Sequence, residues 1–309
     1  MSSTAHDVVV VGAGVAGCAV AYFLARAGRD VALVERDDVA RHQSGRNAGW
    51  IRSLGRTPAE LPLSGIARSL WAELAESCAV PLVRGGCVAL AAGASELARL
   101  EAWARRAGPL APGVRLLDSA SLGAELPFLH GDWHGALVDP GDGHAEPRPA
   151  VLALAGLATA SGVTLLEGRR VEAILVERGR VAGVSVAGVG DRARRGDRAR
   201  RGDRAGGGGG GELTAKVVVC CAGAWSSRLL RRVGLRLPVQ VLRSTLVASK
   251  PLPPVSDAAI LAPGGALRQR VDGSLVIATG IRADLDVTLE SLRFARQFAP
   301  SLGWGLSKL

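Results

Sequence analysis

The first 35 residues combine an unbroken apolar run, a spaced apolar pattern and a second apolar run. Residues 7–11 (DVVVV) are rich in β-branched side chains and predict a strand that is buried on both faces. Residues 16–27 place apolar side chains at helical spacing, and Gly28 follows where a helix would end. The run DVALVE, ending at Glu35, predicts a second strand. This order of strand, helix and strand is typical of a parallel α/β sheet.

Strand-length apolar runs return in the second half of the chain. With glycine turns between them, they cover 163–167, 170–176, 181–186, 213–219 and 217–221. Val217–Cys221 is expected to be a buried parallel strand. Alternating patterns at 82–93 and 235–248 predict further strands, and Ser95–Ala107 predicts an amphipathic helix.

Between two of these strands lies a segment without core-forming residues. A six-residue unit repeats in GDRARRGDRARRGDRA from Gly190, and six glycines follow at 206–211. No apolar side chain larger than Ala occurs in these repeats, so they cannot support a core. Because loop closure becomes only slowly more costly with length, we predict a disordered hairpin insertion over 188–211. An Arg-rich contact to phosphate or RNA is the disfavoured alternative, since charge runs are usually solvated.

Composition narrows the class of protein. The chain has 309 residues, 48% of them hydrophobic, which allows two globular domains. Its formal net charge is +10, but residues 191–204 alone hold seven Arg and three Asp. No nucleic-acid partner is expected, because neither a recognition motif nor many stacking aromatics accompany the charge. Five cysteines without a CxxC pair indicate a reduced, cytoplasmic protein.

The N-terminal region carries no targeting signal that we recognise. MSSTAHD lacks a basic n-region, so no signal peptide is predicted. Residues 8–25 are uncharged and reach the length of a membrane span, but their glycines and the strand that follows argue against one. We expect no integral membrane segment, while peripheral membrane attachment stays open.

The turn after the first strand reads GAGVAG. Gly12 permits the tight turn, Gly14 lets the backbone approach a pyrophosphate, and Gly17 lets helix and strand pack closely. The helix N-terminus favours the phosphate charge. Glu35 ends the second strand, where a carboxylate can accept both ribose hydroxyls. We therefore predict a dinucleotide site for FAD or NAD, because an acid at this position disfavours NADP.

Residues 42–50, HQSGRNAGW, follow that strand closely and lack apolar periodicity. The stretch resembles the D-amino-acid-oxidase superfamily of FAD enzymes, which includes glycine and sarcosine oxidases, D-amino-acid dehydrogenases and opine oxidases. Three more segments resemble the family and follow in its order: GALVDPGDGHAEP, VVVCCAGAW and RQRVDGSLVIATG. The resemblance implies FAD as the cofactor.

The resemblance also implies the architecture. We expect an α/β protein with a Rossmann-like FAD-binding domain at 1–80 and 140–235. A discontinuous, mostly antiparallel α+β substrate domain is expected at 81–139 and 236–309. Family members continue with an Arg-bearing strand, a Gly-rich loop and a helix where this chain ends in GWGLSKL. The expected substrate domain is therefore incomplete at its C-terminus, which leaves flavin retention and activity open.

Several residues are expected at the cofactor by this resemblance. Ser44 to Gly49 are expected along the isoalloxazine and diphosphate, since small residues give a flat heterocycle access to backbone N–H groups. Val171 is expected against the adenine, and Trp225 either at the cofactor or in core packing. The expected cofactor-binding residues are Gly12, Gly14, Val15, Ala16, Gly17, Glu35, Arg36, Ser44, Gly45, Arg46, Asn47, Ala48, Gly49, Val171, Ala222, Gly223 and Trp225.

The implied reaction is oxidation of the CH–NH bond of an amino acid or secondary amine to an imine, by hydride transfer to flavin. We assign no catalytic residue, because a neutral amine needs no dedicated base. We also expect no metal site. His42 and His144 are weighed as groups that tune the amine's protonation, with a structural role favoured for both. Arg268, Gln269 and Arg270 are weighed as partners of a substrate carboxylate, with a surface strand of alternating charges slightly favoured.

Two other functions stay open at this point. One is a truncated or non-catalytic flavoprotein subunit that needs a partner subunit. The other is an NAD-dependent dehydrogenase, since the glycine motif alone does not separate the two dinucleotides. Neither the particular amine nor the choice between oxygen and a quinone as electron acceptor follows from the sequence.

Overall fold

The computed structural model describes residues 4–78, 80–187, 210–278, 284–285 and 287–298. The chain forms two compact units: the first is 1–46, 151–242 and 285–309, and the second is 47–150 and 243–284. These bounds differ from the domain bounds expected from the sequence, and the functional division stays a prediction. The predicted insertion at 188–211 lies outside the described residues except for its last two positions.

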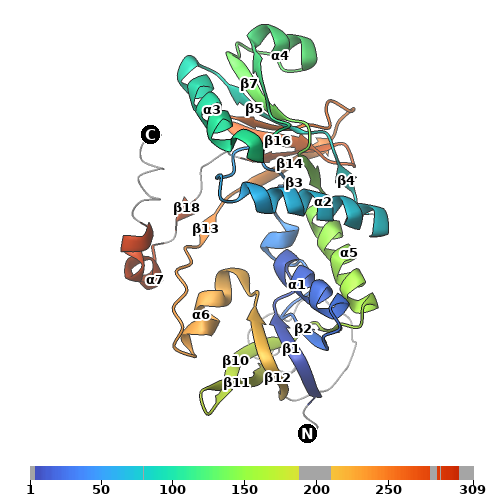
Figure 1. The fold of residues 1–309 in the computed structure, drawn as a ribbon, viewed down its shortest axis with the longest axis vertical. Helices are drawn as coiled ribbons and strands as arrows, with labels where there is room; N and C mark the ends of the chain where they lie inside the picture. The colour runs from blue at the N-terminus through green and yellow to red at the C-terminus, as the bar shows by residue number, and fades with distance from the viewer. Residues whose placement is uncertain (1–3, 79, 188–209, 279–283, 286, 299–309) are drawn as a thin grey trace. The chain divides into compact units, whose positions relative to one another are not determined.

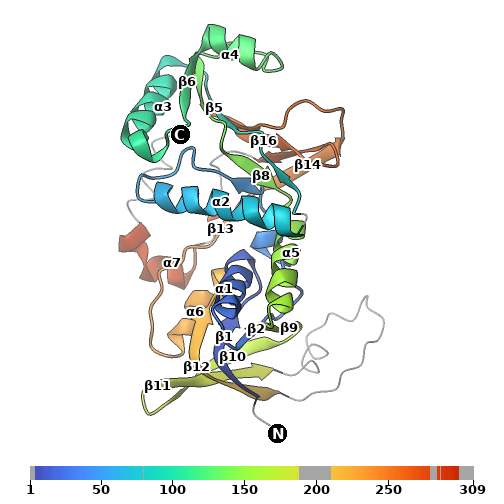
Figure 2. The same ribbon diagram turned by 45° about the vertical axis from the view of Figure 1, so that its right-hand side comes forward.

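The first unit contains a six-stranded sheet. Its strands are β1 (Thr4–Val11), β2 (Val31–Val34), β9 (Thr164–Leu166), β10 (Arg170–Glu177), β11 (Arg180–Ala187) and β12 (Gly211–Cys220). They are ordered β10–β11–β12–β1–β2–β9. Strands β12, β1, β2 and β9 run parallel, while β10 and β11 add an antiparallel hairpin at one edge (Figure 2).

Short helices accompany this sheet in the first unit. They are α1 (Val15–Arg26), α6 (Ser226–Arg231), α7 (Leu289–Arg293), α5 (Pro147–Ala160), which begins in the second unit, and 3-10 turns at Gln43–Gly45 and Gly223–Trp225. Helix α1 packs against β1 and β2 (Figure 1). Gly28, after the end of α1, has a φ of +76°, the left-handed conformation in which glycine ends helices. The predicted order of strand, helix and strand is confirmed.

Burial in this sheet follows the apolar pattern only in part. The run 8–11 is buried throughout, as predicted. At Val217–Cys221 the parallel pairing with β1 is as expected, but the expected burial is wrong: Val217 is 49% exposed, and residues 218–221 are only partly buried. Neighbouring residues of a strand face opposite sides, and it is Val218 that packs on the core around Val9.

The second unit contains two sheets. The larger consists of β5 (Cys87–Ala91), β6 (Arg115–Asp118), β7 (Gly135–Asp139), β14 (Leu246–Pro251), β15 (Ala259–Ala262), β16 (Gly265–Gln269) and β17 (Ser274–Ala278). Its order is β14–β17–β16–β15–β5–β7–β6, with every pairing antiparallel except that of β15 with β5. The smaller is β3 (Trp50–Ile51), β8 (Gly143–Ala145) and β4 (Leu82–Val83), all antiparallel. The mostly antiparallel α+β class is thus confirmed.

Helices cover parts of these sheets. They are α2 (Leu61–Cys78), α3 (Ala94–Ala107), α4 (Ser119–Glu125) and a 3-10 turn at Gly108–Leu110. Helix α3 packs on β5 and β7 (Figure 1), and its Leu100 and Trp103 lie against a buried cluster that includes Leu54 and Leu137. The helix predicted from Ser95 is confirmed to within one residue.

The strand pattern predicted at 235–248 is only partly correct. Residues 235–241 have no regular structure, and the strands there are β13 (Leu242–Arg243), which pairs with β18 (Asp284–Leu285), and the start of β14. Pro238 lies in the irregular stretch, and proline has no N–H to donate to a strand ladder. Separately, none of the helices in the described residues is long and apolar enough to cross a membrane.

Candidate functional site

The turn between β1 and α1 is packed so closely that a side chain does not fit at Gly12 or Gly17, and one at Gly14 would have to displace the Ser44 side chain. A Cβ at Gly12 would lie 2.6 Å from the carbonyl oxygen of Cys221, and φ there is +101°. A Cβ at Gly17 would lie 1.8 Å from the carbonyl oxygen of Gly12, and one at Gly14 would lie 2.8 Å from Ser44 Oγ. The turn therefore leaves its backbone bare, as a loop that approaches a pyrophosphate requires.

Helix α1 begins without a competing negative charge. Gly14 occupies its N-cap position without a side-chain hydrogen bond, and no acidic residue lies in its first turn. The N–H of Val15 donates to Ser44 Oγ at 3.0 Å. The positive end of the helix dipole therefore favours an anion such as phosphate beside the glycine turn.

Glu35 follows β2 and is only 8% exposed. Its Oε2 accepts the N–H of Ala13 at 2.8 Å, and its Oε1 accepts the N–H of Asp37 at 2.9 Å. A carboxylate offers about four acceptor positions, so each oxygen keeps capacity for a ribose hydroxyl. The backbone thus fixes this carboxylate in place, as needed to accept the hydroxyl pair of a ribose.

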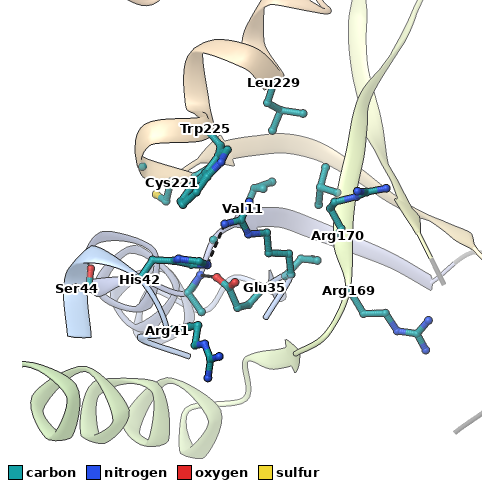
Figure 3. A pocket seen from close by; sticks show the side chains of 18 of the residues that line it. Val11, Glu35, Arg41, His42, Ser44, Arg169, Arg170, Cys221, Trp225 and Leu229 are labelled. Carbon is teal, nitrogen blue, oxygen red and sulfur yellow. Dashed lines mark hydrogen bonds between the residues drawn. The ribbon is translucent and has the colours of Figure 1, made fainter. Parts of the chain in front are cut away.

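These groups line a pocket of ≈ 550 Å³ within the first unit (Figure 3). That volume lies in the range usual for cofactor sites. Val11 and Val34, at the carboxyl ends of β1 and β2, and Cys221, which follows β12, form part of its wall. Ligands of parallel sheets bind at this edge. Burial raises the pKa of the Cys221 thiol, so it lines the pocket as a neutral group.

One wall of the pocket carries a stacked aromatic ring. The guanidinium carbon of Arg36 lies 3.7 Å from the centroid of the Trp225 ring. The centroid of the His42 ring lies 4.8 Å from that of Trp225, and both rings are labelled in Figure 3. Asp37 Oδ2 contacts Arg36 Nε at 3.1 Å and His42 Nε2 at 2.9 Å. Trp225 is 38% exposed, so it lines the pocket rather than packing in a core. A flat ligand ring can stack on such a surface.

Arginines dominate the rest of the lining. Arg41, Arg169, Arg170, Arg228 and Arg232 all line the pocket, against the two acids Glu35 and Glu172. Such an excess of positive charge raises the local concentration of an anionic ligand. These arginines could not be predicted from the sequence, because they are scattered along the chain and belong to no motif.

A set of possible metal ligands lies in the same pocket wall. Ligand atoms of Glu35, Asp37 and His42 lie within 4.8 Å of one another. Arg36 donates to Asp37 and contacts His42 Nε2 at 2.9 Å, and two backbone N–H groups occupy Glu35. A cation beside Arg36 would meet a fixed positive charge, so we assign these residues to the hydrogen-bond network of the pocket.

Most of the expected cofactor residues meet in this pocket. Its lining includes Gly12, Gly14, Glu35, Arg36, Ser44, Val171, Ala222, Gly223 and Trp225. The remaining expected residues do not line the pocket. Three of them form the first turn of α1, namely Val15, Ala16 and Gly17, while Gly45 packs against Ala40 and Arg46 is exposed. The last three belong to the second unit: Asn47, Ala48 and Gly49. Their roles toward the cofactor stay predictions.

Two residues that we weighed for the substrate are buried in the second unit. His144 and Arg268 are each 1% exposed. Burial, followed by the charge of Arg268, lowers the pKa of His144 to about 4, so the ring is neutral. Arg268 Nη1 forms an ion pair with Glu146 at 2.9 Å. The alternative of a surface strand with alternating charges is therefore wrong at Arg268, whose side of β16 is covered.

The fold and the pocket have the features of a protein that binds an adenine dinucleotide at the ends of parallel strands. The glycine turn, the uncapped start of α1 and the buried Glu35 fit the pyrophosphate and ribose of FAD. The sequence model of the DAO family, described as FAD dependent oxidoreductase, matches residues 7–304. The chain therefore belongs to this family of FAD-dependent oxidoreductases, and FAD is its cofactor.

Comparisons with individual proteins agree with the assignment of the chain to this family. Glycine oxidase of Geobacillus kaustophilus is 28% identical over 273 residues, which are 84% of this chain and 66% of that enzyme. Sarcosine oxidase subunit beta of Rhodobacter capsulatus is 26% identical, over 89% of this chain and 64% of that protein. The structure of L-amino acid deaminase from Proteus vulgaris matches with a TM-score of 0.82 at 20% identity, over 97% of this chain and 66% of that one. The chain thus spans about two thirds of each of these proteins.

Proposed function

We propose that this chain oxidises the CH–NH bond of an amino acid or a secondary amine to an imine. The first-unit pocket carries the proposal, because its glycine turn, uncapped helix start and buried carboxylate suit an adenine dinucleotide. Family membership supports flavin chemistry. The relatives named glycine oxidase and sarcosine oxidase subunit beta support an amine as the substrate.

In this proposal the first unit holds the adenosine and pyrophosphate half of FAD. Gly12 and Gly14 expose backbone to the pyrophosphate, Glu35 accepts the ribose hydroxyls, and Val171 and Trp225 contact the adenine. Residues 44–49 extend along the isoalloxazine. We accordingly propose the first unit as the cofactor-binding part and the second unit as the part that contributes most to substrate binding.

Bound FAD supplies the acceptor for the hydride that leaves the carbon next to the nitrogen, and the imine then hydrolyses. The chain's own residues bind and orient the cofactor and the amine, and they exclude water from the site. When the amine binds in its neutral form, no side chain has to remove a proton first. This agrees with the absence of an assigned general base from our proposal.

The absorbance spectrum of the purified protein loaded with FAD tests the proposal. We expect a yellow protein whose flavin band bleaches when glycine, sarcosine or an opine is added without oxygen. A colourless protein that takes up no FAD would contradict it. A fluorescence change on titration with NADH, in the absence of FAD uptake, would favour the nicotinamide alternative.

A matched pair of variants ties FAD uptake to the pocket. Glu35→Gln removes the charge that strengthens the ribose hydrogen bonds, and we expect the dissociation constant of FAD to rise about 10–100-fold. Glu125→Gln removes a carboxylate of the second unit that is exposed and paired with Arg115, so FAD affinity should not change. Equal affinities in the two variants would remove Glu35 from the site.

One comparison favours a second proposal, that activity needs a partner subunit. The relative from Rhodobacter capsulatus is itself named as a subunit. If the chain binds FAD but no amine bleaches it, co-expression with the products of neighbouring genes should restore bleaching. Bleaching by the isolated chain would contradict this second proposal.

A further inference from the structure

Residues 48–50 are tied to distant parts of the second unit. Arg268 on β16 donates from Nε to the carbonyl oxygen of Ala48, 220 residues away in the sequence. The N–H of Ala145 donates to the carbonyl oxygen of Gly49 at 2.9 Å. Trp50 pairs with His144 between β3 and β8. The backbone of this short stretch is thus fixed by a buried side chain on one side and by a strand on the other.

The remaining hydrogen bonds of Arg268 hold its guanidinium in one orientation. Nη1 donates to Glu146 Oε1 at 2.9 Å and to His144 Nδ1 at 3.2 Å, and Nη2 reaches the carbonyl oxygen of Ala145 at 3.5 Å. Because His144 accepts at Nδ1, its proton is on Nε2, which donates to the carbonyl oxygen of Asp257 at 3.1 Å. The planar fork of an arginine can serve all these acceptors together, whereas the single ammonium of lysine cannot.

Glu146 supplies the opposing charge. It is 4% exposed, and its Oε2 accepts from Arg270 Nε at 2.8 Å while Oε1 accepts from Arg268. Burial raises the pKa of Glu146, but the hydrogen bonds from Arg268 and Arg270 outweigh it and leave the pKa below its usual value. The carboxylate is therefore ionised at neutral pH. Its main chain is fixed as well, because its carbonyl oxygen accepts the N–H of Ala150 at 3.0 Å in the first turn of α5.

Gly49 shows how closely the stretch lies against this cluster. Its φ is +76°, and a Cβ there would lie 2.1 Å from the carbonyl oxygen of Ala145 and 3.1 Å from Arg268 Nη2. The guanidinium group thus lies so close to the backbone of Gly49 that no side chain fits between them. A change at Arg268 is therefore expected to be felt by this backbone directly.

We infer that Arg268, oriented by Glu146, is a positioning residue that sets the backbone of residues 48–50 for the flavin ring. The inference rests on the proposed function, in which the isoalloxazine extends along residues 44–49. Neither side chain needs to touch the cofactor. Their effect on it is transmitted by the carbonyl group of Ala48 and by the close contact at Gly49.

Residues 53 and 54, a few positions further along the chain, are held by a different side chain and serve as an internal reference. The N–H groups of Ser53 and Leu54 donate to the carboxylate of Asp142 at 2.7 and 3.0 Å. Arg68 holds that carboxylate at 3.1 Å. A change at Arg268 should therefore alter residues 48–50 and leave residues 53–54 as they are.

Hydrogen exchange of the whole apoprotein tests the inference without depending on activity. In Arg268→Lys we expect the amide of Ala145, which donates to the carbonyl oxygen of Gly49, to exchange about tenfold faster or more, because the fork that holds this backbone is lost. The amide of Gly49 donates to Asn47 Oδ1 and should exchange faster by a smaller factor. Glu146→Gln should act in the same direction with a smaller change. Arg115→Lys alters an exposed Arg–Glu pair of the same unit, with contacts of 3.1 and 3.0 Å to Glu125, and should change neither amide.

The FAD-loaded variants give the second measurement. Arg268→Lys should raise the dissociation constant of FAD about tenfold and alter the fine structure of the flavin absorbance, while Arg115→Lys matches the wild type. Unchanged exchange at Gly49 and Ala145 together with an unchanged flavin spectrum would overturn the inference. If Arg268→Lys also speeds exchange in β5 (Cys87–Ala91), the protein has unfolded, and Glu146→Gln then decides by the same two criteria.

The proposed function fails separately from this inference. If the wild type takes up no FAD, the proposed function is wrong, and the positioning role toward the flavin falls with it. If the wild type takes up FAD and the variants at Arg268 and Glu146 bind it with unchanged affinity and spectrum, only the positioning role is wrong.

Discussion

The pocket of the first unit and the buried cluster of the second are built in opposite ways. The part of the pocket suited to a pyrophosphate and a ribose is mainly backbone, with a glycine turn at 12–17, the start of α1 and one carboxylate that backbone N–H groups hold. The cluster is mainly side chains, and its ion pair joins Arg268 to Glu146 across 122 residues of sequence. A site made of backbone depends on steric room, whereas a site made of buried charges depends on mutual pairing. The two should therefore respond differently to substitution.

The largest effect on stability is expected from breaking the buried pair. Arg268→Met leaves Glu146 buried with only Arg270 as a partner. We expect the free energy of unfolding to fall by about 3 kcal/mol, since a buried carboxylate that loses one of its two arginine partners is only partly compensated. Urea unfolding followed by circular dichroism measures it. Adding Glu146→Leu should recover most of the loss, because apolar replacement of both partners is often neutral. A double variant as unstable as the single one would show that shape rather than charge matters here.

The next largest effect is steric and belongs to the pocket. Gly17→Ala places a Cβ 1.8 Å from the carbonyl oxygen of Gly12, so α1 or β1 must shift. We expect a loss of about 2–3 kcal/mol in unfolding free energy and no measurable FAD uptake. Gly156→Ala is the matched control in the first unit, because nothing lies within 4 Å of its added Cβ on helix α5. Full FAD binding by Gly17→Ala would mean that the turn is not the pyrophosphate site.

The same contrast explains what could be predicted from the sequence. Gly12, Gly17 and Glu35 can be predicted from the sequence as cofactor residues, because a backbone site needs fixed residue types within one short stretch. The pairing of Arg268 with Glu146 was not found, since it exists only after β16 and the start of α5 have come together in the fold. A local pattern also cannot tell which face of an apolar strand the fold will cover, and Val217 was assigned wrongly for this reason.

The response to pH is expected to distinguish the cluster from the rest of the chain. The pKa of His144 is lowered from 6.5 to about 4 by burial and by Arg268. Below pH 6.5 the unfolded chain therefore binds a proton at this residue, whereas the folded chain binds it only below about pH 4. The free energy of unfolding falls as the pH drops through this window. From neutral pH to about pH 5 we expect a loss of about 2 kcal/mol from this residue.

Unfolding in urea at a series of pH values tests this assignment. His144→Asn should lower stability at neutral pH and flatten the dependence between pH 6.5 and 4. The control is His134→Asn, because His134 is exposed and has no hydrogen bond through its ring among the described residues. A wild-type pH dependence retained in His144→Asn would assign the acid sensitivity to other groups.

The smallest effect is expected at Gly28, where glycine serves the backbone conformation at the end of α1 and not the close packing of the turn before it. Gly28 has a φ of +76°, as a helix C-terminus prefers, but nothing lies within 4 Å of a Cβ added there. Gly28→Ala therefore meets a conformational cost only, about 1 kcal/mol, and FAD affinity should equal that of the wild type. Gly17→Ala meets a collision and should lose the cofactor. Thermal unfolding and FAD titration of the two variants side by side decide between these causes. A loss of FAD binding in Gly28→Ala would mean that the end of α1, and not only its start, determines the geometry of the pocket.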